Sequence, residues 1–466
     1  MPDAMPRATD KPFRVEHATL SDLGMRRTNN QDAVAVDIEA NGSGRRGAGS
    51  RGDVFMVADG MGAHAAGELA SKLAVDTIPH AYKKQADLAP QAALRRAVRK
   101  ANELIHAKGQ SSHEFNGMGT TCSCLLLLDE AALVAHVGDS RVYRLRGDRL
   151  EQLTFDHSLV WELAAASRIT ADKVPACIPK NVITRSLGPH DHVNVDLEGP
   201  FELRDGDTFL ICSDGLTAVV EDDVIGAIIG AIEPQDAGQT LVDIANLRGG
   251  PDNISVVIAR VGKNDARPAA GVSSTALPKV NRLEAGVPPA TWATAGACAV
   301  ATAWFWSQQE YAWAVAAGVG LAASALIAMW QRGDVSAADP TTTLGGPYGD
   351  GPYRHVDCVP GEPAAVAIGA VVEELAALEG RDASEGGPPV DDWRQFHEDR
   401  HKAVHAAEQG DMAVAVQGYG AAVRGLMEQV RANQTVDYDP MASPVSPYAA
   451  GPAGEGEEGG NDGATS

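Results

Sequence analysis

The sequence lacks the features of a disulfide-stabilised, secreted or nucleic-acid-binding protein. Its 466 residues contain six cysteines, and none of them forms a C-x-x-C pair. Several lie within apolar runs, which indicates buried, reduced thiols. The formal net charge is -23, which argues against general nucleic-acid binding, and we expect no nucleic-acid partner. Residues 1–12 are polar and proline-containing, without a signal-peptide pattern, and we expect them to be disordered.

The length predicts two or three domains and a sizeable core. Residues 13–262 read as short strands together with helices in two antiparallel pairs. They lack the regular strand–helix alternation of a doubly wound parallel sheet, which favours an α+β fold. Within this part, Asp156 is a candidate N-cap for a helix that continues through Ala166.

One carboxylate in this part lies at the end of a buried strand. The apolar run from Val54 to Ala58 ends in Asp59 and Gly60, and a helical pattern starts near Gly67. The run predicts a strand. A carboxylate at its end, followed by glycines that allow close backbone approach, can present a ligand to a cation or a phosphate. Taken alone, however, Asp-Gly is more typical of an ordinary turn.

Four further aspartates occupy comparable places. Asp139 and Asp214 each end an apolar strand in a turn, Asp252 lies in a turn just before a strand, and Asp32 precedes another strand. Carboxylates gathered at strand ends repel one another unless cations hold them together. Hard oxygen ligands without a His/Cys cluster favour magnesium or manganese over zinc.

Several short motifs follow one another across about half the chain. In chain order they are Arg27-Thr28-Asn29-Asn30-Gln31-Asp32, Asp59-Gly60-Met61-Gly62-Ala63-His64, Gly117-Met118-Gly119-Thr120-Thr121, Gly138-Asp139-Ser140-Arg141, Leu153-Thr154-Phe155-Asp156-His157-Ser158, Thr184-Arg185-Ser186-Leu187-Gly188, Ser213-Asp214-Gly215-Leu216 and Asp252-Asn253. In this order they resemble the protein phosphatase 2C family, the metal-dependent protein phosphatases, in its bacterial form. The set is highly specific, although no single motif is.

The resemblance implies a fold and an activity for residues 13–262. The fold is a four-layer α-β-β-α sandwich with two central antiparallel sheets and a metal site at one edge. The activity is that of a protein serine/threonine phosphatase, in which a metal-activated water hydrolyses phosphoserine or phosphothreonine. The implied partners are phosphoproteins, the substrates of a Ser/Thr kinase, and the implied cofactors are Mn²⁺ or Mg²⁺, two ions in the main site and a third, weaker one.

The resemblance also assigns metal ligands. Asp59 bridges the two main ions, and the carbonyl of Gly60 ligates one of them. Asp214 and Asp252 complete the shell of the other ion, and Asp139 together with Asp214 holds the third.

Two further roles and two departures concern residues near these ligands. The resemblance implies that Asp32 belongs to the metal site, where it supports the metal-bound water, and that Asp32 and Arg27 are the catalytic residues. Arg27 binds the substrate phosphate, to which a guanidinium fork is suited. The family pattern usually has Glu at Gln31 and Gly at Ala63. Since Gln31 lacks a negative charge, it motivates an alternative function, a catalytically weak or inactive phosphoprotein-binding scaffold.

Two apolar runs without Asp, Glu, Lys or Arg, 290–306 and 311–330, predict a transmembrane hairpin. Lys279 and Arg282 precede the pair, Arg332 follows it, and the short connector has no positive charge. This bias predicts a multi-pass protein of the cell membrane with a cytoplasmic catalytic domain. A buried, alanine-rich hairpin in a soluble domain is one alternative. A single span by the second run, with the C-terminal helices outside the cell, is another.

The remaining segments complete the predicted domain organisation. Residues 263–289 are predicted to be a linker, and residues 331–390 a linker with a short helix. Residues 391–431 predict a helical hairpin whose spacing resembles one tetratricopeptide-type pair and which is available for a protein partner. A plain hairpin fits equally well. Residues 432–466 are predicted to be a disordered acidic tail.

Overall fold

The structure is a computed structural model. It describes residues 9–10, 13–38, 45–46, 51–63, 65–169, 173–175, 177–179, 182–263, 348–358, 362–380, 390 and 392–436. The predicted membrane segments 290–306 and 311–330 lie outside these residues, as does most of the predicted tail 432–466. Among the helices that are described, none is long and apolar enough to cross a membrane.

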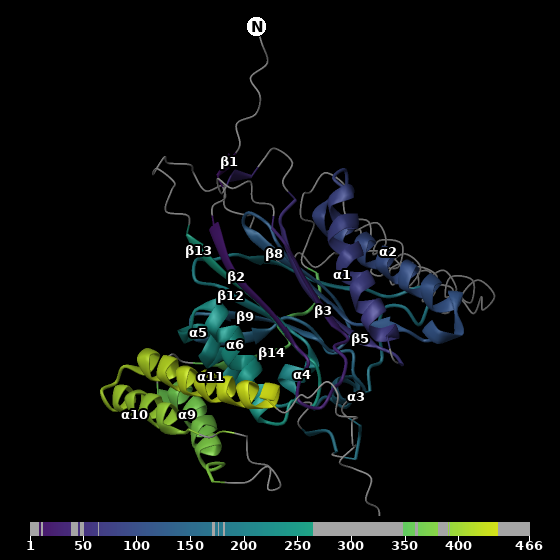
Figure 1. The fold of residues 1–466 in the computed structure, drawn as a ribbon. Helices are drawn as coiled ribbons and strands as arrows, with labels where there is room; N and C mark the ends of the chain where they lie inside the picture. The colour runs from purple at the N-terminus through teal and green to yellow at the C-terminus, as the bar shows by residue number, and fades with distance from the viewer. Residues whose placement is uncertain are drawn as a thin grey trace, which may run out of the picture.

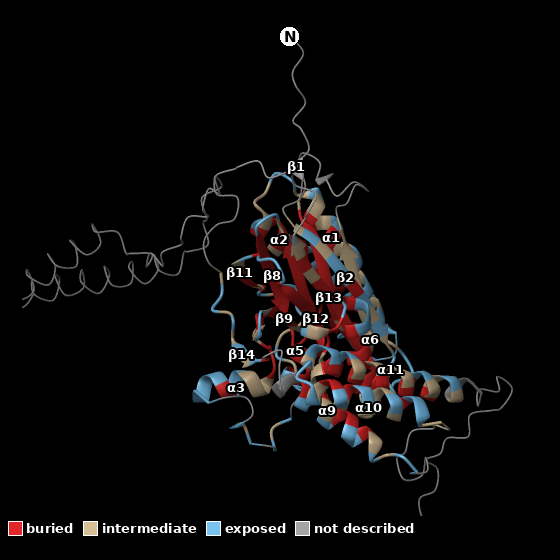
Figure 2. Cartoon of the chain, turned by 90° about the vertical axis from the view of Figure 1, so that its left-hand side faces the viewer, coloured by how far each residue is buried: buried red, intermediate tan, exposed pale blue. Residues whose placement is uncertain are grey.

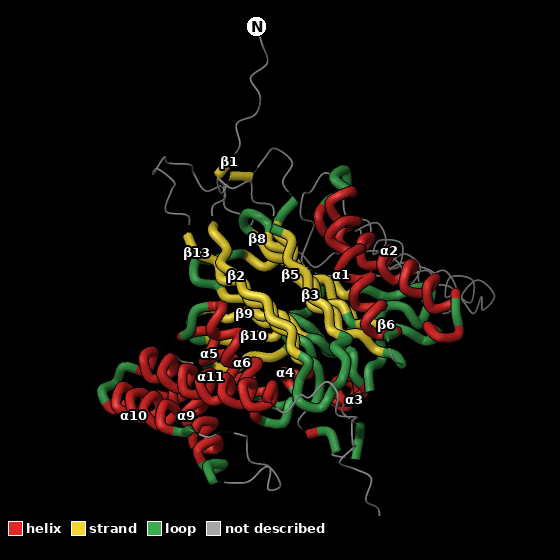
Figure 3. The backbone as a smooth tube through the Cα atoms, in the orientation of Figure 1, coloured by secondary structure: helices red, strands yellow, loops and turns green. Residues whose placement is uncertain are grey.

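Two antiparallel sheets lie at the centre of the molecule (Figures 1 and 3). The first, here the β13 sheet, has the order β14 (Arg354–Asp357), β10 (Arg149–Gln152), β9 (Arg141–Arg146), β12 (Thr208–Cys212), β13 (Ile254–Lys263) and β2 (Phe13–Asp22). The second, here the β5 sheet, has the order β11 (Asp196–Glu202), β8 (Ala131–Val137), β7 (Cys122–Leu127), β5 (Asp53–Met61) and β3 (Asp32–Asp37), with β6 (Gly119–Thr120) beside the end of β5. The predicted antiparallel α+β architecture is confirmed.

Helices cover the outer face of each sheet. The described helices of the chain are α1 (Ala66–Lys84), α2 (Pro90–Ser111), α3 (Leu159–Ser167), α4 (Asp214–Thr217), α5 (Asp222–Ala231), α6 (Pro234–Leu247), α9 (Glu362–Ala376), α10 (Arg394–Glu408) and α11 (Met412–Val436), with the short 3-10 helix His113–Phe115 after α2. Helices α1 and α2 pack on the β5 sheet, and α5 and α6 pack on the β13 sheet. A two-residue pair, β1 (Thr9–Asp10) with β4 (Arg45–Arg46), lies apart from both sheets.

Strand β5 shows why the sheets form a sandwich. Successive side chains of a strand point to opposite faces of the sheet. Val54, Met56 and Ala58 therefore pack against α1 and α2, while Phe55 and Val57 pack against the β13 sheet. All five are fully buried, so the apolar run that predicts a strand is continuous because both faces of the strand are covered. Figure 2 shows buried residues, in red, concentrated in the central strands and on the inner sides of the helices.

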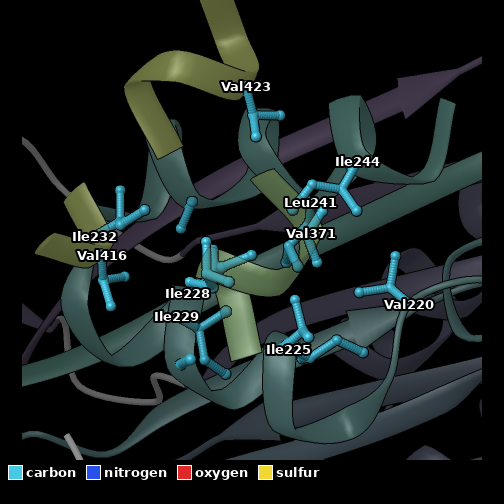
Figure 4. Close-up of a cluster of buried hydrophobic side chains, with 14 of the residues drawn as sticks. Val220, Ile225, Ile228, Ile229, Ile232, Leu241, Ile244, Val371, Val416 and Val423 are labelled. Carbon is cyan, nitrogen blue, oxygen red and sulfur yellow. The ribbon is translucent and has the colours of Figure 1, made fainter. Parts of the chain in front are cut away.

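The C-terminal helices share one hydrophobic core with α5 and α6. Figure 4 shows side chains of this core from both parts of the chain, Ile225, Ile228, Ile229, Leu241, Ile244, Val371, Val416 and Val423. A further strand, β14, pairs antiparallel with β10. Residues 348–436 are therefore joined to the sandwich by a common core and by a sheet edge.

Three local predictions differ from the structure. The range 331–390, predicted as a linker with one short helix, contains β14 as well as α9 in its described part. Helices α10 and α11 occupy the range predicted as a hairpin, and α11 continues to Val436. Asp156 is not a helix N-cap, because Ser158 accepts the amide hydrogen of Trp161 at 3.4 Å. Asp156 instead forms a buried ion pair with Arg141.

Candidate active site

The pairing of β3 with β5 brings two of the predicted site residues together. The antiparallel register places Asp32, the first residue of β3, directly opposite Asp59 near the end of β5. The Gly60 amide also donates to the Gln31 carbonyl at 3.1 Å. Residues directly opposite in an antiparallel pair present their side chains on the same face, so the sheet itself sets the two carboxylates beside each other.

Two threonines hold the backbone of Asp59. Its amide donates to Thr121 Oγ1 at 2.9 Å, and its carbonyl accepts from the Thr121 amide at 2.8 Å and from Thr120 Oγ1 at 2.9 Å. Both backbone groups of Asp59 are therefore satisfied by protein. The motif Gly117-Met118-Gly119-Thr120-Thr121 has no role that its sequence alone indicates, and in the structure its threonines fix the position of Asp59.

Gly60 lies where two chain segments come very close. A Cβ at this position would be 2.2 Å from the Gly67 carbonyl oxygen and 2.5 Å from the Gln31 carbonyl oxygen. No side chain fits there without a shift of the backbone. The resemblance implies that Gly60 contributes its carbonyl to a metal, and the structure adds a packing reason for a glycine here.

Polar side chains follow the end of β12. Ser213 Oγ donates to Asp32 Oδ2 at 2.8 Å and accepts from the Ser255 amide at 3.0 Å. Asp214 comes next and opens α4. The sequence signal for Ser213 is its place beside Asp214 in a family motif, which does not by itself indicate a contact with Asp32.

Asn253 ties the loop before β3 to the start of β13. Its Nδ2 donates to the carbonyl oxygens of Leu23 at 2.9 Å and Asn29 at 3.0 Å. Its Oδ1 accepts from the Gln31 amide at 2.8 Å. Because this loop carries Arg27, the buried Asn253 holds Arg27 near the aspartates. This role also went unrecognised in the sequence.

Arg27 reaches the carboxylates at the mouth of the site. Its Nη2 donates to Asp252 Oδ2 at 2.6 Å, and about half of its side chain (49%) remains exposed. This hydrogen bond is the main cause that raises the pKa of Arg27, and the charges of Asp252, Asp59 and Asp214 add to it. A half-exposed guanidinium fork in this position can bind an incoming phosphate.

Burial and mutual repulsion act on the aspartates. Burial is the main cause that raises the pKa of Asp32 and of Asp139, each to about 7. Burial also raises the pKa of Asp59 well above its ordinary value, and repulsion by Asp32, Asp214, Asp139 and Asp252 raises it further. The pKa of Asp214 is raised by burial and then by Asp252. The structure therefore brings together all five aspartates that the sequence analysis singled out.

Three oxygens of this cluster have no hydrogen-bond partner in the described part of the chain, namely Oδ1 of Asp32, Asp139 and Asp214. Leaving a buried carboxylate oxygen unpartnered is unfavourable. Such oxygens are hard ligands that suit Mg²⁺ or Mn²⁺, so the donor set fits a divalent-cation centre. As the side chains stand, no group of three or more His, Cys, Asp or Glu among the described residues encloses an ion position. A bound ion would need to draw them together.

The structure accommodates both departures from the family pattern, Gln31 and Ala63. Gln31 Nε2 donates to the Gly62 carbonyl at 3.2 Å, and the side chain lies so close to Gly67 that a Cβ there would be 2.8 Å from Nε2. Gln31 thus supports the turn after Gly60. Ala63 is exposed, so its methyl group has room.

A chain of polar contacts fixes the backbone before Asp139. The Gly138 amide donates to His157 Nδ1 at 2.9 Å, and His157 Nε2 lies 2.9 Å from Asp196 Oδ2. The other oxygen of Asp196 accepts from Arg185 Nη1 at 2.6 Å. Two family motifs, those containing His157 and Arg185, therefore act together to place Asp139.

Known proteins are similar to this half of the chain. Residues 26–234 match the family model described as protein phosphatase 2C. Protein phosphatase PhpP of Streptococcus pneumoniae is 38% identical over 256 residues, which cover 54% of this chain and 100% of PhpP. The chain belongs to the protein phosphatase 2C family. It is a protein-serine/threonine phosphatase.

Two further matches concern phosphatases named PstP. The serine/threonine protein phosphatase PstP of Mycobacterium tuberculosis is 36% identical over 247 residues, which cover 53% of this chain and 45% of PstP. A crystal structure of a PstP catalytic domain in complex with two manganese ions is 34% identical, with a TM-score of 0.45, and the match covers 54% of this chain and 100% of that one. About half of this chain is matched in each comparison.

Proposed function

We propose that this phosphatase hydrolyses phosphoserine and phosphothreonine in proteins by means of divalent cations, Mn²⁺ or Mg²⁺, and that it works tethered to a membrane. The substrates are phosphoproteins produced by a Ser/Thr kinase. The observation that carries the catalytic part is the convergence of one buried aspartate, Asp139, and four half-buried aspartates from separate segments. Asp32, Asp139 and Asp214 each have one unpartnered oxygen among the described residues, and Arg27 lies at the edge of the set.

The proposed metal ligands are the carboxylates of Asp59, Asp214 and Asp252 and the carbonyl of Gly60 for two main ions, with Asp139 and Asp214 for a third, weaker ion. Asp32 lies beside this set, opposite Asp59 in the sheet. When bound, the ions activate water as a nucleophile at neutral pH and offset the charge of the phosphoryl group. This donor set, rich in carboxylates, suits that chemistry.

The protein's own groups orient the substrate and accept the proton. Arg27, which pairs with Asp252, is placed to bind and orient the phosphate dianion by hydrogen bonds to its oxygens. Asp32 receives a hydrogen bond from Ser213 at Oδ2, while Oδ1 has no partner and can accept a proton from the attacking water. Burial raises the pKa of Asp32 to about 7 in the metal-free chain. The positive charge of bound ions would lower this pKa and favour the carboxylate form, which is the form that accepts a proton.

The catalytic proposal is tested by manganese titration of phosphopeptide hydrolysis. Asp59→Asn removes the charge that the other aspartates surround, and we expect kcat/KM to fall by about 10²-fold or more at saturating manganese. Asp148→Asn, at an exposed turn, is the matched control and should change nothing. Full activity of Asp59→Asn, or turnover that is indifferent to metal, would rule out the proposed site.

The scaffold alternative is not favoured, because the family and both relatives are phosphatases. The residue that motivated it, Gln31, has a structural use through its hydrogen bond to Gly62. Gln31→Glu in the same titration measures how far glutamine at position 31 lowers the apparent affinity for manganese. We expect the apparent affinity for manganese to rise, since a carboxylate adds charge near the site.

The membrane proposal depends on the apolar runs 290–306 and 311–330, and the packing of the described residues supports two crossings rather than one. Residues 13–263 and 348–436 share one core and one sheet edge. A single crossing would place α9, α10 and α11 across the bilayer from α5 and α6 and expose their common apolar surface. Both flanks of the hairpin are therefore proposed to be cytoplasmic.

Protease accessibility on intact cells tests this topology. With two crossings, neither the catalytic domain nor the residues after 348 should be cut from outside. Cleavage after residue 348 by an external protease would contradict the hairpin. The predicted protein partner of the 391–431 helices stays a prediction, although the buried face of α11 already packs on α5, α6 and α9.

A further inference from the structure

Helix α2 carries a concentration of positive charge in an acidic protein. Four basic residues, Arg95, Arg96, Arg99 and Lys100, are exposed or half-exposed on this helix and are called here the α2 basic face. The chain as a whole has a net charge of -23. Lys100 pairs with Glu103 at 3.0 Å. No ion pair joins the three arginines to a carboxylate within the described part of the chain.

The helical repeat makes this arrangement unfavourable for the isolated domain. Arg95 and Arg99, and likewise Arg96 and Lys100, are four residues apart, and like charges at this spacing destabilise a helix. Burial is the main cause that lowers the pKa of Arg95, and the charge of Arg99 lowers it further. The opposite side of α2 is committed to the core through Leu94, Ala97, Val98, Ala101 and Ile105. The basic side is largely exposed, and at one end of it Arg99 lines a pocket together with Glu103 and Asp191.

The α2 basic face lies where the chain returns to the domain. Tyr348 is the first residue described after Lys263, and it packs on the core beneath α1 and α2. It also lies within electrostatic reach of Arg95. The second apolar run ends at residue 330, so the 17 or so residues between it and Tyr348 reach at most about 60 Å even when fully extended. A bilayer holding that run stays within this distance of α2.

We propose that the α2 basic face binds anionic lipid headgroups of the membrane that holds the chain, and thereby orients the catalytic domain at the bilayer. This rests on the membrane tethering proposed above. Basic side chains near an anionic leaflet are attracted to it within a Debye length. Leu104, which is 40% exposed, lies one turn after Lys100 and can enter the apolar part of the interface.

The position of α2 also favours lipid over an acidic protein as the occupant. A tether converts binding to the bilayer into an intramolecular event with a high effective concentration, which no freely diffusing partner has. In Figure 1, α2 flanks one side of the sandwich and α9, α10 and α11 lie at the opposite side. Docking through α2 therefore leaves the C-terminal helices facing away from the lipid.

Energy transfer in nanodiscs tests the proposal with the full chain. The donor dye is attached to Ala107→Cys, an exposed α2 position. Cys177→Ser removes the exposed thiol, and Cys298→Ser removes the thiol of the first apolar run. The acceptor is in the lipid headgroups. We expect transfer to rise about twofold when about a third of a neutral lipid is replaced by an anionic one, and to fall again at high salt.

Two fourfold variants decide whether α2 causes this rise. Glutamine at all four positions of the α2 basic face should abolish it. Glutamine at Arg149, Arg204, Arg394 and Lys402, which are exposed basic residues elsewhere, removes the same charge and should preserve it. Hydrolysis of a small phosphate ester in detergent should be unchanged in both. Equal transfer in neutral and anionic discs, a rise that survives the α2 variant, or a rise that requires added cytoplasmic protein would overturn the proposal.

A separate experiment tests whether the chain is tethered to the membrane. Release of the wild-type chain from membranes by alkaline carbonate would show that the tethering proposal is wrong. In that case the same full chain is mixed with anionic vesicles and sedimented. If wild type binds the vesicles and the α2 variant binds about tenfold less, the α2 basic face binds anionic lipid without the tether. Equal sedimentation of the two proteins would refute lipid binding by this face.

Discussion

Gly215 offers a sharp test of how closely the site is packed. A Cβ at this position would lie 2.0 Å from the backbone carbonyl oxygen of Asn253. Neither atom can turn away, because a Cβ is attached directly to the backbone. Non-bonded contacts of this kind are normally above 3 Å, so Gly215→Ala must separate the start of α4 from the start of β13 by about 1 Å. These two segments carry Asp214 and Asp252, two of the proposed ligands.

A displacement of about 1 Å at reacting groups can lower a rate by about 10²-fold, and the added strain should destabilise the fold by about 1–3 kcal/mol. Phosphopeptide kcat/KM and thermal unfolding measure the two effects. Gly425→Ala is the matched control, because that glycine lies within α11 with no atom near its Cβ position. It should leave activity unchanged and stabilise by up to about 1 kcal/mol. Near-normal activity and stability of Gly215→Ala would refute the geometry described for the site.

Other predictions concern stability. Leu426→Ala in α11 should lower the free energy of unfolding by about 2–5 kcal/mol, because Leu426 is fully buried in the core shared with α5 and α6; Val414→Ala, at a 49% exposed position, should cost less than about 0.5 kcal/mol in the same denaturation assay. Arg431→Ala removes the partner of the buried Asp243 and should cost about 3 kcal/mol. Since the pKa of Asp243 is already raised to about 6 by burial, the loss should be greatest above that pH and relieved by Asp243→Asn. Glu198→Gln should flatten the pH dependence of stability: burial raises the pKa of Glu198 from 4.5 to about 7, so the folded wild type binds the proton more tightly than the unfolded chain and loses stability as the pH rises across that window.

Local pattern was enough to find the elements that position the site. The apolar run ending at Asp59 predicts β5, and the periodicity after Pro90 predicts α2, because burial imposes a period of two on strands and of 3.6 on helices. The ordered motifs supplied the family, and the structure brings Arg27 and the five aspartates together as that resemblance implies.

Contacts between residues far apart in the sequence could not be predicted from local pattern. Strand β14 has four residues with exposed or half-buried side chains, so its own sequence carries little strand signal, and its partner β10 lies some two hundred residues earlier. Asp156 has the local sequence of a helix N-cap, but its side chain forms an ion pair with Arg141 of β9. Asn253 forms hydrogen bonds to Leu23, Asn29 and Gln31 of the loop between β2 and β3, a role that depends on the sheets bringing this loop near it.

The most direct test of the central claim is a count of bound metal. Equilibrium dialysis with manganese, read out as ions per chain, should give two ions bound tightly and a third bound weakly by wild type. Asp59→Asn should lose both tight sites, since Asp59 is proposed to bridge them, while Asp148→Asn should bind as wild type does. Two tight ions retained by Asp59→Asn, or no tight manganese in active wild type, would contradict the account.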